Sequence, residues 1–438
     1  MIPGNGECII MQNSWLRDKN TSVFLAANNF LKISLVSFLV KFLIVFFGIT
    51  MCFFINYHEI NAYAADEFGN IVIVIDPGHG GTEGGTQDGA SSNGILEKNI
   101  NMDVAKAMKQ ELESYGGVKV YLTHKDANVS MSIARRAAFA KSVGADFVYS
   151  IHFNASESKD KFGAELWIPS VGNYYVCGKQ YGDILENEFK SLGVFWRGIR
   201  TRIGDDGDEY YGIIRECEWK GIPAVIIEHC HMDNKNDEHF FMSESIRNEF
   251  GIADATAVAK YFGLKNDKND FTDYKKTQVE VPTQRVYPDE TPPEICILSL
   301  NEKTEKGCVS FTIDAIDSGS GINYYSYSLD GGKEYSELFV WNDEDSDNKV
   351  QVTLVNINEK NVDLMVRVYN KSDMVTVSNL VSFNMKNGGI GENRDGGKQE
   401  ILFNKISSRM KKNILFALLL VAGIGLTVLL KGRRTEKR

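Results

Sequence analysis

Two histidines and one glutamate stand beside apolar segments in a pattern that suggests metal chemistry. His79 follows the β-branched run Ile71–Ile75 directly after Asp76-Pro77-Gly78, and His152 ends a second apolar run that begins at Phe147. Glu97 lies between them and opens a segment with a helical apolar stripe. Two imidazoles and one carboxylate form a catalytic zinc set that leaves a fourth position for water.

A third apolar run, from Pro223 to Ile227, ends in Glu228. A glutamate beside a zinc site can act first as general base and then as general acid. Capping of the following helix is the structural alternative for Glu228. Taken one at a time, the other three residues also have structural alternatives, a satisfied core histidine or a capping glutamate. The four together are much harder to explain in that way.

The elements that must position these residues alternate between strand and helix. Strands are predicted near 71–75, 118–123, 146–152, 163–168, 210–215 and 223–228, and helices near 97–115, 131–143, 176–192 and 236–262. This alternation predicts an α/β fold with helices on both faces of the sheet. Because ligands of such sheets gather at the carboxyl ends of the strands, the candidate residues are placed where a site is expected.

Four segments in this order resemble the zinc-dependent N-acetylmuramoyl-L-alanine amidases of the AmiC/CwlV-like type. They are Asp76-Pro77-Gly78-His79-Gly80-Gly81, Glu97-Lys98-Asn99, Ser150-Ile151-His152-Phe153-Asn154-Ala155 and Ala224-Val225-Ile226-Ile227-Glu228. Shorter fragments, Leu122-Thr123-His124, Ser132-Ile133-Ala134-Arg135-Arg136, Arg197-Gly198-Ile199-Arg200 and Ile213-Ile214-Arg215-Glu216, extend the resemblance over roughly residues 70–263.

The resemblance implies a mostly parallel six-stranded sheet flanked by helices. It also implies that His79, Glu97 and His152 hold Zn²⁺ and that Glu228 is the catalytic acid and base. The implied substrate is peptidoglycan, cleaved at the amide between the lactyl group of N-acetylmuramic acid and L-alanine. The chain departs from the family after Glu228, where we favour packing or surface roles for His229 and His231 over contact with substrate.

The length and net charge of the chain limit the number of domains and the kinds of partner that we expect. A chain of 438 residues exceeds one ordinary domain, and the net charge of -10 argues against nucleic acid as a partner. The seven cysteines have no metal-type CxxC spacing. Cys296 and Cys308 lie within one later domain and could pair, but free thiols fit equally well and the sequence predicts no particular disulfide. The aspartate-rich stretch from Gly204 to Tyr211 is a candidate lid or an ordinary solvated loop.

The chain is expected to divide into seven parts. These are a signal peptide or N-terminal membrane segment (1–65), the catalytic domain (66–265), a linker (266–290), an all-β immunoglobulin-like sandwich (291–386), a polar linker (387–412), a transmembrane helix (413–431) and a basic cytoplasmic tail (432–438). The sandwich is indicated by short alternating strands with turns such as Asp330-Gly331-Gly332. Its aromatic cluster, Tyr324, Tyr325 and Tyr327, is a candidate contact for glycan or protein, with alternating core and surface tyrosines the favoured alternative.

Both ends of the chain carry apolar segments. The stretch from Phe42 to Ile55 followed by Ala62-Tyr63-Ala64 is typical of a cleaved signal, with an uncleaved anchor from Ile33 to Ile55 as the alternative. The stretch from Ile414 to Leu430 is followed by the basic tail, which indicates a cytoplasmic carboxyl end. We therefore expect a protein of the bacterial cell membrane with its catalytic domain on the extracytoplasmic, cell-wall side.

Other functions remain open on these residues. A zinc peptidase that cleaves within the stem peptides would use the same metal set. A degenerate amidase that binds wall glycan as a scaffold and a tethered adhesion protein are the non-enzymatic alternatives. The β-sandwich is a spacer and a candidate contact for a protein activator.

Overall fold

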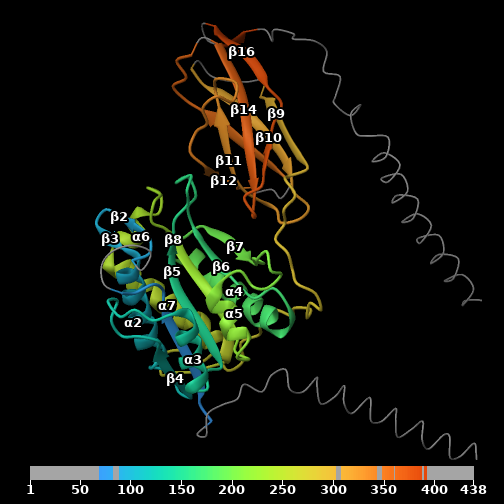
Figure 1. The fold of residues 1–438 in the computed structure, drawn as a ribbon. Helices are drawn as coiled ribbons and strands as arrows, with labels where there is room; N and C mark the ends of the chain where they lie inside the picture. The colour runs from blue at the N-terminus through green and yellow to red at the C-terminus, as the bar shows by residue number, and fades with distance from the viewer. Residues whose placement is uncertain are drawn as a thin grey trace, which may run out of the picture. The chain divides into compact units, whose positions relative to one another are not determined.

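The computed structural model describes residues 69–81, 88–301, 307–342, 348–359, 361–386 and 389–391 (Figure 1). The chain divides into two compact units, with the boundary in the sequence between Asp289 and Glu290. The predicted N-terminal signal or membrane segment, the transmembrane helix and the basic tail lie outside the described residues. Within the described part of the chain, no helix has both the length and the apolar character needed to cross a membrane.

The first unit is built from alternating strands and helices. Its strands are β1 (Ile71–Pro77), β2 (Ser91–Ser92), β3 (Ile95–Leu96), β4 (Val118–Leu122), β5 (Phe147–Asn154), β6 (Ala164–Trp167), β7 (Trp196–Arg200) and β8 (Ala224–His231). Its helices are α2 (Glu97–Leu112), α3 (Ile133–Ser142), α4 (Gly172–Ser191), α5 (Gly212–Glu218), α6 (Glu238–Met242) and α7 (Glu244–Phe262).

Six of these strands form one sheet in the order β4-β1-β5-β8-β6-β7. The pairs β4–β1, β1–β5, β5–β8 and β6–β7 are parallel, and β6 pairs antiparallel with β8. The predicted six-stranded, mostly parallel sheet is therefore confirmed. Since β1, β5 and β8 are parallel neighbours, their carboxyl ends meet at one edge, where the candidate residues lie.

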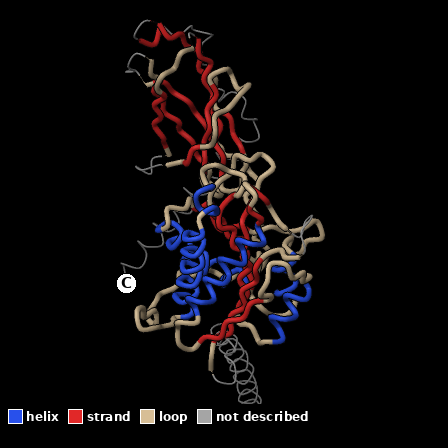
Figure 2. The backbone as a smooth tube through the Cα atoms, turned by 90° about the vertical axis from the view of Figure 1, so that its left-hand side faces the viewer, coloured by secondary structure: helices blue, strands red, loops and turns tan. Residues whose placement is uncertain are grey.

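Helices cover both faces of this sheet, as Figure 2 shows. On one face α2, α4 and α7 pack in a core that includes Ile73 and Ile75, and on the other α3 and α5 pack around Val74. Successive side chains of a strand point to opposite faces, so the uninterrupted β-branched run of β1 is buried on both sides. This double burial fixes the end of β1, and with it the start of the His79 loop.

Two secondary-structure predictions were wrong in detail. Residues near 210–215 do not form a strand; they lie in helix α5 and the turn before it, and the sheet edge is β7 instead. Ile213, Ile214 and Cys217 are buried against α3 and β8, a helical spacing that a short apolar run does not reveal. The predicted helix 236–262 divides at Ser243, whose Oγ accepts a hydrogen bond from the Ile246 amide at 3.4 Å and begins α7.

The second unit is rich in β-structure, as predicted. Its strands are β9 (Ile295–Leu300), β10 (Val309–Ile316), β11 (Ile322–Ser328), β12 (Phe339–Val340), β13 (Lys349–Leu354), β14 (Asn361–Asn370), β15 (Val375–Val377), β16 (Val381–Lys386) and β17 (Gly389–Gly391). They form two antiparallel sheets, β13-β10-β9 and β12-β11-β14-β16-β17, with β15 paired to β14.

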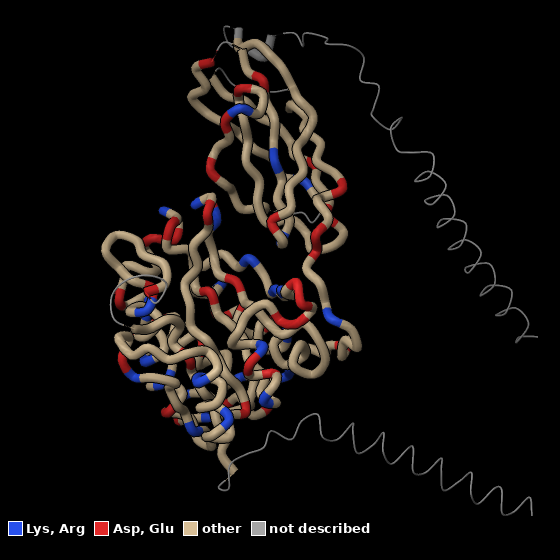
Figure 3. Tube along the Cα trace, in the orientation of Figure 1, with Lys and Arg blue, Asp and Glu red and all other residues tan. Residues whose placement is uncertain are grey.

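Both sheets of the second unit contribute to one hydrophobic core, with Phe311 from the first sheet and Val366 from the second. Tyr324 is fully buried, and the ring of Tyr325 stacks on Phe339 at 5.4 Å between centroids. These two tyrosines therefore pack in the interior. Figure 3 shows acidic and basic positions interspersed along the described chain of both units.

Candidate functional site

His79 sits in a loop at the end of β1 that is held from several directions. Its backbone has φ 62°, and its carbonyl accepts a hydrogen bond from Arg136 Nη2. Arg136 Nη1 also donates to Pro77 O at 2.6 Å and pairs with Asp76 Oδ1 at 2.8 Å. Arg136, on α3, thus fixes the backbone that presents the His79 ring.

Gly78 allows the rings of His79 and His152 to approach each other. A Cβ at position 78 would lie 2.3 Å from His152 Cε1, so only glycine lets the backbone run against that ring. The Gly78 amide donates to Ile151 O at 2.8 Å, which ties the loop to β5 just before His152. The rings of His79 and His152 consequently lie 5.0 Å apart between centroids, at 75°.

Glu97 occupies the first turn of α2 and is buried. Its Oε2 accepts a hydrogen bond from the Ala90 amide at 2.8 Å, and its Oε1 accepts from the Phe153 amide at 3.2 Å and from Asn101 Nδ2 at 3.3 Å. Asn101, one turn later on α2, also donates to Gly78 O at 3.2 Å. Hydrogen bonds from the chain before α2, from α2 itself and from β5 therefore fix the carboxylate.

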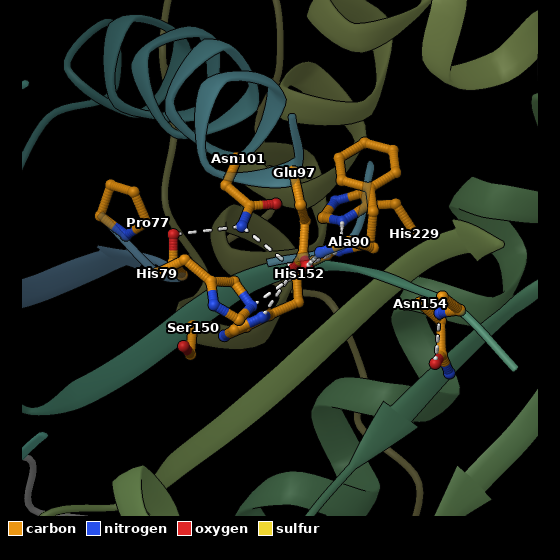
Figure 4. A network of polar contacts seen from close by, with 12 residues as sticks. Pro77, His79, Ala90, Glu97, Asn101, Ser150, His152, Asn154 and His229 are labelled. Atoms are coloured by element: carbon orange, nitrogen blue, oxygen red, sulfur yellow. Dashed lines mark hydrogen bonds and ion pairs between the residues drawn. The ribbon is translucent and has the colours of Figure 1, made fainter. Parts of the chain in front are cut away.

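The structure brings His79, Glu97 and His152 together, as Figure 4 shows. His79 Nε2 lies 3.1 Å from Glu97 Oε2, and His152 Nδ1 lies 3.0 Å from Glu97 Oε1. One ligand atom from each of the three residues lies within 4.8 Å of the others. Burial opposes ionisation of Glu97, but hydrogen bonds from His152 and His79 outweigh it and hold the pKa of this carboxyl well below its usual range.

This cluster fits a zinc ion. Two ligand atoms bound to tetrahedral zinc are about 3.3 Å apart, close to the two nitrogen–oxygen separations observed. Imidazole nitrogen and carboxylate oxygen are both ordinary zinc ligands, and three protein ligands leave a position for water or substrate. Hydrogen bonds from Ala90 and Asn101 orient the carboxylate in the way that a second layer of partners orients metal ligands.

Glu228 lies beside this cluster on β8, in register with His152 on β5. Its Oε2 is buried and has no hydrogen-bond partner among the described residues. Burial, followed by the charges of Glu97 and Glu165, raises the pKa of Glu228 well above its ordinary value, against the opposing effect of Arg197. A carboxyl group with a raised pKa and a free oxygen next to a metal site is suited to accept and donate a proton.

A cavity of about 310 Å³ opens beside the two histidines. Asp76, Arg136, His79 and His152 line its polar side. The rest of the lining comes largely from the ends of α3 and α5 and from β8, with Met131, Ile133, Tyr211, Gly212, Ile213 and Ile226. His79 and His152, two of the three candidate ligands, therefore face a space in which a substrate can be bound.

Three residues of the site were not assigned roles from the sequence. Lys98 is buried, pairs with Asp88 Oδ1 at 2.6 Å and donates to Gly81 O at 2.9 Å, so it joins the chain after His79 to the chain before Glu97. Arg136 holds the His79 loop, and Glu165 lies opposite Glu228. A charged residue within a short apolar strand is the signal that would have identified Glu165.

The histidines after Glu228 are part of the interior. His229 Nδ1 lies 2.9 Å from His152 O and its Nε2 lies 2.9 Å from Asp254 Oδ2, so this ring connects β5 to α7. His231 Nδ1 lies 3.0 Å from Gly163 O. Both side chains are buried outside the three-residue cluster, in agreement with the packing role favoured from the sequence. Burial also raises the pKa of the Cys230 thiol between them.

Comparison with known proteins associates the first unit with one family. A profile described as N-acetylmuramoyl-L-alanine amidase matches residues 73–260. N-acetylmuramoyl-L-alanine amidase CwlM of Bacillus licheniformis is 32% identical over 200 residues, which are 45% of this chain and 71% of that protein. N-acetylmuramoyl-L-alanine amidase LytC of Bacillus subtilis (strain 168) is 30% identical over 165 residues, 38% of this chain and 30% of LytC.

Among solved structures, the catalytic domain of CwlV, an N-acetylmuramoyl-L-alanine amidase from Bacillus (Paenibacillus) polymyxa var. colistinus, is 28% identical to this chain. The match has a TM-score of 0.37 and covers 44% of this chain and 99% of that one.

Proposed function

Since the chain belongs to the N-acetylmuramoyl-L-alanine amidase family, we propose that it is a zinc-dependent hydrolase of peptidoglycan. The bond cleaved is the amide between N-acetylmuramic acid and L-alanine. The observation that carries this proposal is the convergence of His79, Glu97 and His152 within 4.8 Å, with Glu228 next to them. A zinc ion at these three residues would supply Lewis acidity to the scissile carbonyl and to the attacking water.

Glu228 is the proton carrier in this mechanism. Its raised pKa allows the carboxyl to hold a proton, and its buried Oε2 has no competing hydrogen bond among the described residues. As general base it takes a proton from the attacking water, and as general acid it passes that proton to the departing nitrogen of L-alanine. A substrate bound in the cavity next to His79 and His152 would lie beside two of the three candidate ligands.

We also propose that the protein is held at the bacterial cell membrane with its catalytic unit on the cell-wall side. The support is the apolar stretch from Ile414 to Leu430 with basic residues after it, together with a substrate that lies outside the membrane. The second unit, whose two sheets share one core, is proposed as an immunoglobulin-like spacer and as the surface where a protein activator binds.

The test is zinc content and product analysis of the full chain in detergent. Zinc per chain is counted first, and the protein is then incubated with purified peptidoglycan and the products are identified by mass spectrometry. One zinc per chain and free stem peptides that begin at L-alanine are the expected result. Cleavage between stem residues would assign a peptidase instead, and zinc without any cleavage would favour the scaffold role.

A further inference from the structure

The segment that follows α7 lies along the first unit as a strap, residues 282–286. Gly172 N donates to Pro282 O at 3.0 Å, and Val286 N donates to Ser170 O at 2.7 Å. Thr201 Oγ1 donates to Val286 O at 2.6 Å. The strap therefore joins the start of α4 to the chain that leaves β7.

Arg285 in the strap neutralises a buried carboxylate. Its Nη1 pairs with Glu209 Oε1 at 2.6 Å and its Nη2 pairs with Asp208 Oδ1 at 2.7 Å. Glu209 is 1% exposed, and its Oε1 also accepts from the amide and the hydroxyl of Ser170 at 2.7 and 2.6 Å. A buried carboxylate is costly unless it is paired and hydrogen-bonded, so Glu209 depends on Arg285 to stay in this position.

Glu209 belongs to the connection from β7 to α5, which also carries Tyr211. Arg215 Nη1 on α5 donates to the carbonyls of Glu209 and Tyr210 at 2.5 and 3.1 Å. These hydrogen bonds tie the residues just before Tyr211 to the helix that follows it. The Tyr211 ring packs on Trp167 at 4.9 Å between centroids and lines the cavity shared with His79 and His152. Burial, and then the charges of Glu228 and Glu165, raise the pKa of Tyr211.

We propose that Arg285 is a positioning residue of the active site, which holds Glu209 and thereby keeps Tyr211 in the wall of the substrate cavity. The inference rests on the proposed function, because it assigns a role in substrate binding to residues outside the metal cluster. Arg285 touches neither the three candidate ligands nor Glu228 in any contact described above. Its loss should therefore weaken substrate binding more than it slows the chemical step.

The experiment compares Arg285→Ala, Arg285→Lys and Thr201→Val in the full chain. Lys275→Ala is the control, because it removes an exposed cation from the chain between α7 and the strap. Three quantities are measured: kcat and KM on a soluble muramyl peptide, zinc per chain, and hydrogen exchange of backbone amides in residues 201–211. For Arg285→Ala we expect KM to rise at least about fivefold, the lower end of a typical coupling between two sites.

In the same variant we expect faster exchange in residues 201–211, kcat within about twofold of the parent and unchanged zinc. Arg285→Lys restores the cation, so its KM should return close to the parent value. Thr201→Val removes a different contact of the strap, so its KM should rise as in Arg285→Ala. Lys275→Ala should match the parent in all three measurements.

Two outcomes in the Arg285→Ala variant would overturn the inference. Unchanged KM with unchanged exchange in Arg285→Ala would mean that the ion pair does not hold the connection. A lower kcat at constant KM, with less zinc per chain, would mean that the variant merely contains fewer folded molecules. A parent chain without amidase activity would refute the proposed function and the role in substrate binding, while the exchange measurement would still test whether Arg285 holds residues 201–211.

Discussion

Glu165 lies directly opposite Glu228 in the antiparallel pairing of β6 with β8. Glu165 Oε2 pairs with Arg197 Nη1 at 3.2 Å and with Arg200 Nε at 3.0 Å, and its Oε1 accepts from Asn154 Nδ2 at 2.7 Å. Glu228 Oε2 has no such partner among the described residues. The environments of the two carboxylates therefore differ: Glu165 is held by two guanidinium groups and an amide, whereas Glu228 keeps an oxygen that can take up a proton.

Replacement of Glu228 should separate metal binding from turnover. Glu228→Gln keeps the size of the side chain and removes its ability to take up a proton, so we expect kcat to fall by about 10²- to 10⁴-fold. Zinc per chain should remain at the parent value, because Glu228 is outside the three-residue cluster. Parallel measurement of zinc content and product release checks this, and a variant with parental activity would remove Glu228 from the mechanism.

Replacement of Glu165 should act mainly on stability. Glu165→Gln removes the carboxylate that pairs with Arg197, a buried guanidinium. Breaking a buried ion pair by removal of one partner costs about 3–5 kcal/mol. Denaturant unfolding of the variant should show a loss of this size, and a loss below about 1 kcal/mol would show that the pair is not needed to stabilise the fold.

Removal of either candidate histidine ligand should abolish zinc binding. His79→Ala and His152→Ala each leave one imidazole and one carboxylate, which is too few ligands for a stable catalytic site. We expect zinc per chain to fall close to zero in both. His239→Ala, which removes an exposed histidine from α6, is the control and should keep the parental zinc content.

Gly89 offers a test of the cluster's geometry with a well-matched control. A Cβ at Gly89 would lie 2.3 Å from Glu97 Oε2 and 2.7 Å from His79 Cδ2. Gly94 has a similar φ, +79° against +72° for Gly89, but a Cβ there meets nothing within 4 Å. Both alanine variants therefore carry the same backbone strain, and only Gly89→Ala displaces the candidate ligands.

We expect Gly89→Ala to weaken zinc binding by about 10- to 100-fold, as loss of supporting contacts around a metal does. Gly94→Ala should change stability alone. Competition with a chelator measures the two affinities, and equal affinities would mean that the cluster tolerates displacement of Glu97.

Asp237 should make the stability of the first unit depend on pH. Burial raises the pKa of Asp237 to about 6, although the amides of His231 and Gly163 donate to its Oδ2. In the unfolded chain this pKa is about 3.9, so the folded state binds the proton more tightly. The contribution of Asp237 to stability is therefore complete below about pH 4 and is lost as the pH rises through about 6.

Asp237→Asn does not titrate and should lack this dependence. Relative to the variant, the parent should lose up to about 3 kcal/mol between pH 4 and pH 7. Denaturant unfolding at both pH values measures the difference, with Asp273→Asn, an exposed acid, as the control. A parallel pH dependence of parent and Asp237→Asn would contradict the prediction.

The sequence predicted the candidate site better than its surroundings. His79 follows β1, His152 and Glu228 lie near the ends of β5 and β8, and Glu97 begins α2, so the apolar runs in the sequence were enough to locate them. The roles of Glu165 and Arg136 depend on which strand or loop lies opposite them, and that is a property of the folded chain. The misassigned residues near 210–215 had an apolar run too short to distinguish strand from helix. Likewise, polar composition after α7 indicates a linker but not the backbone hydrogen bonds of residues 282–286.

The three candidate ligands come from three separate elements, the end of β1, the start of α2 and the end of β5. No local piece of chain holds more than one of them, so β1 and β5 must pair before the donors meet. Metal capture is thus coupled to completed folding. Under the proposed location on the cell-wall side, a chain exported in an extended state would take up the ion only after crossing the membrane, and it would be inactive during transit.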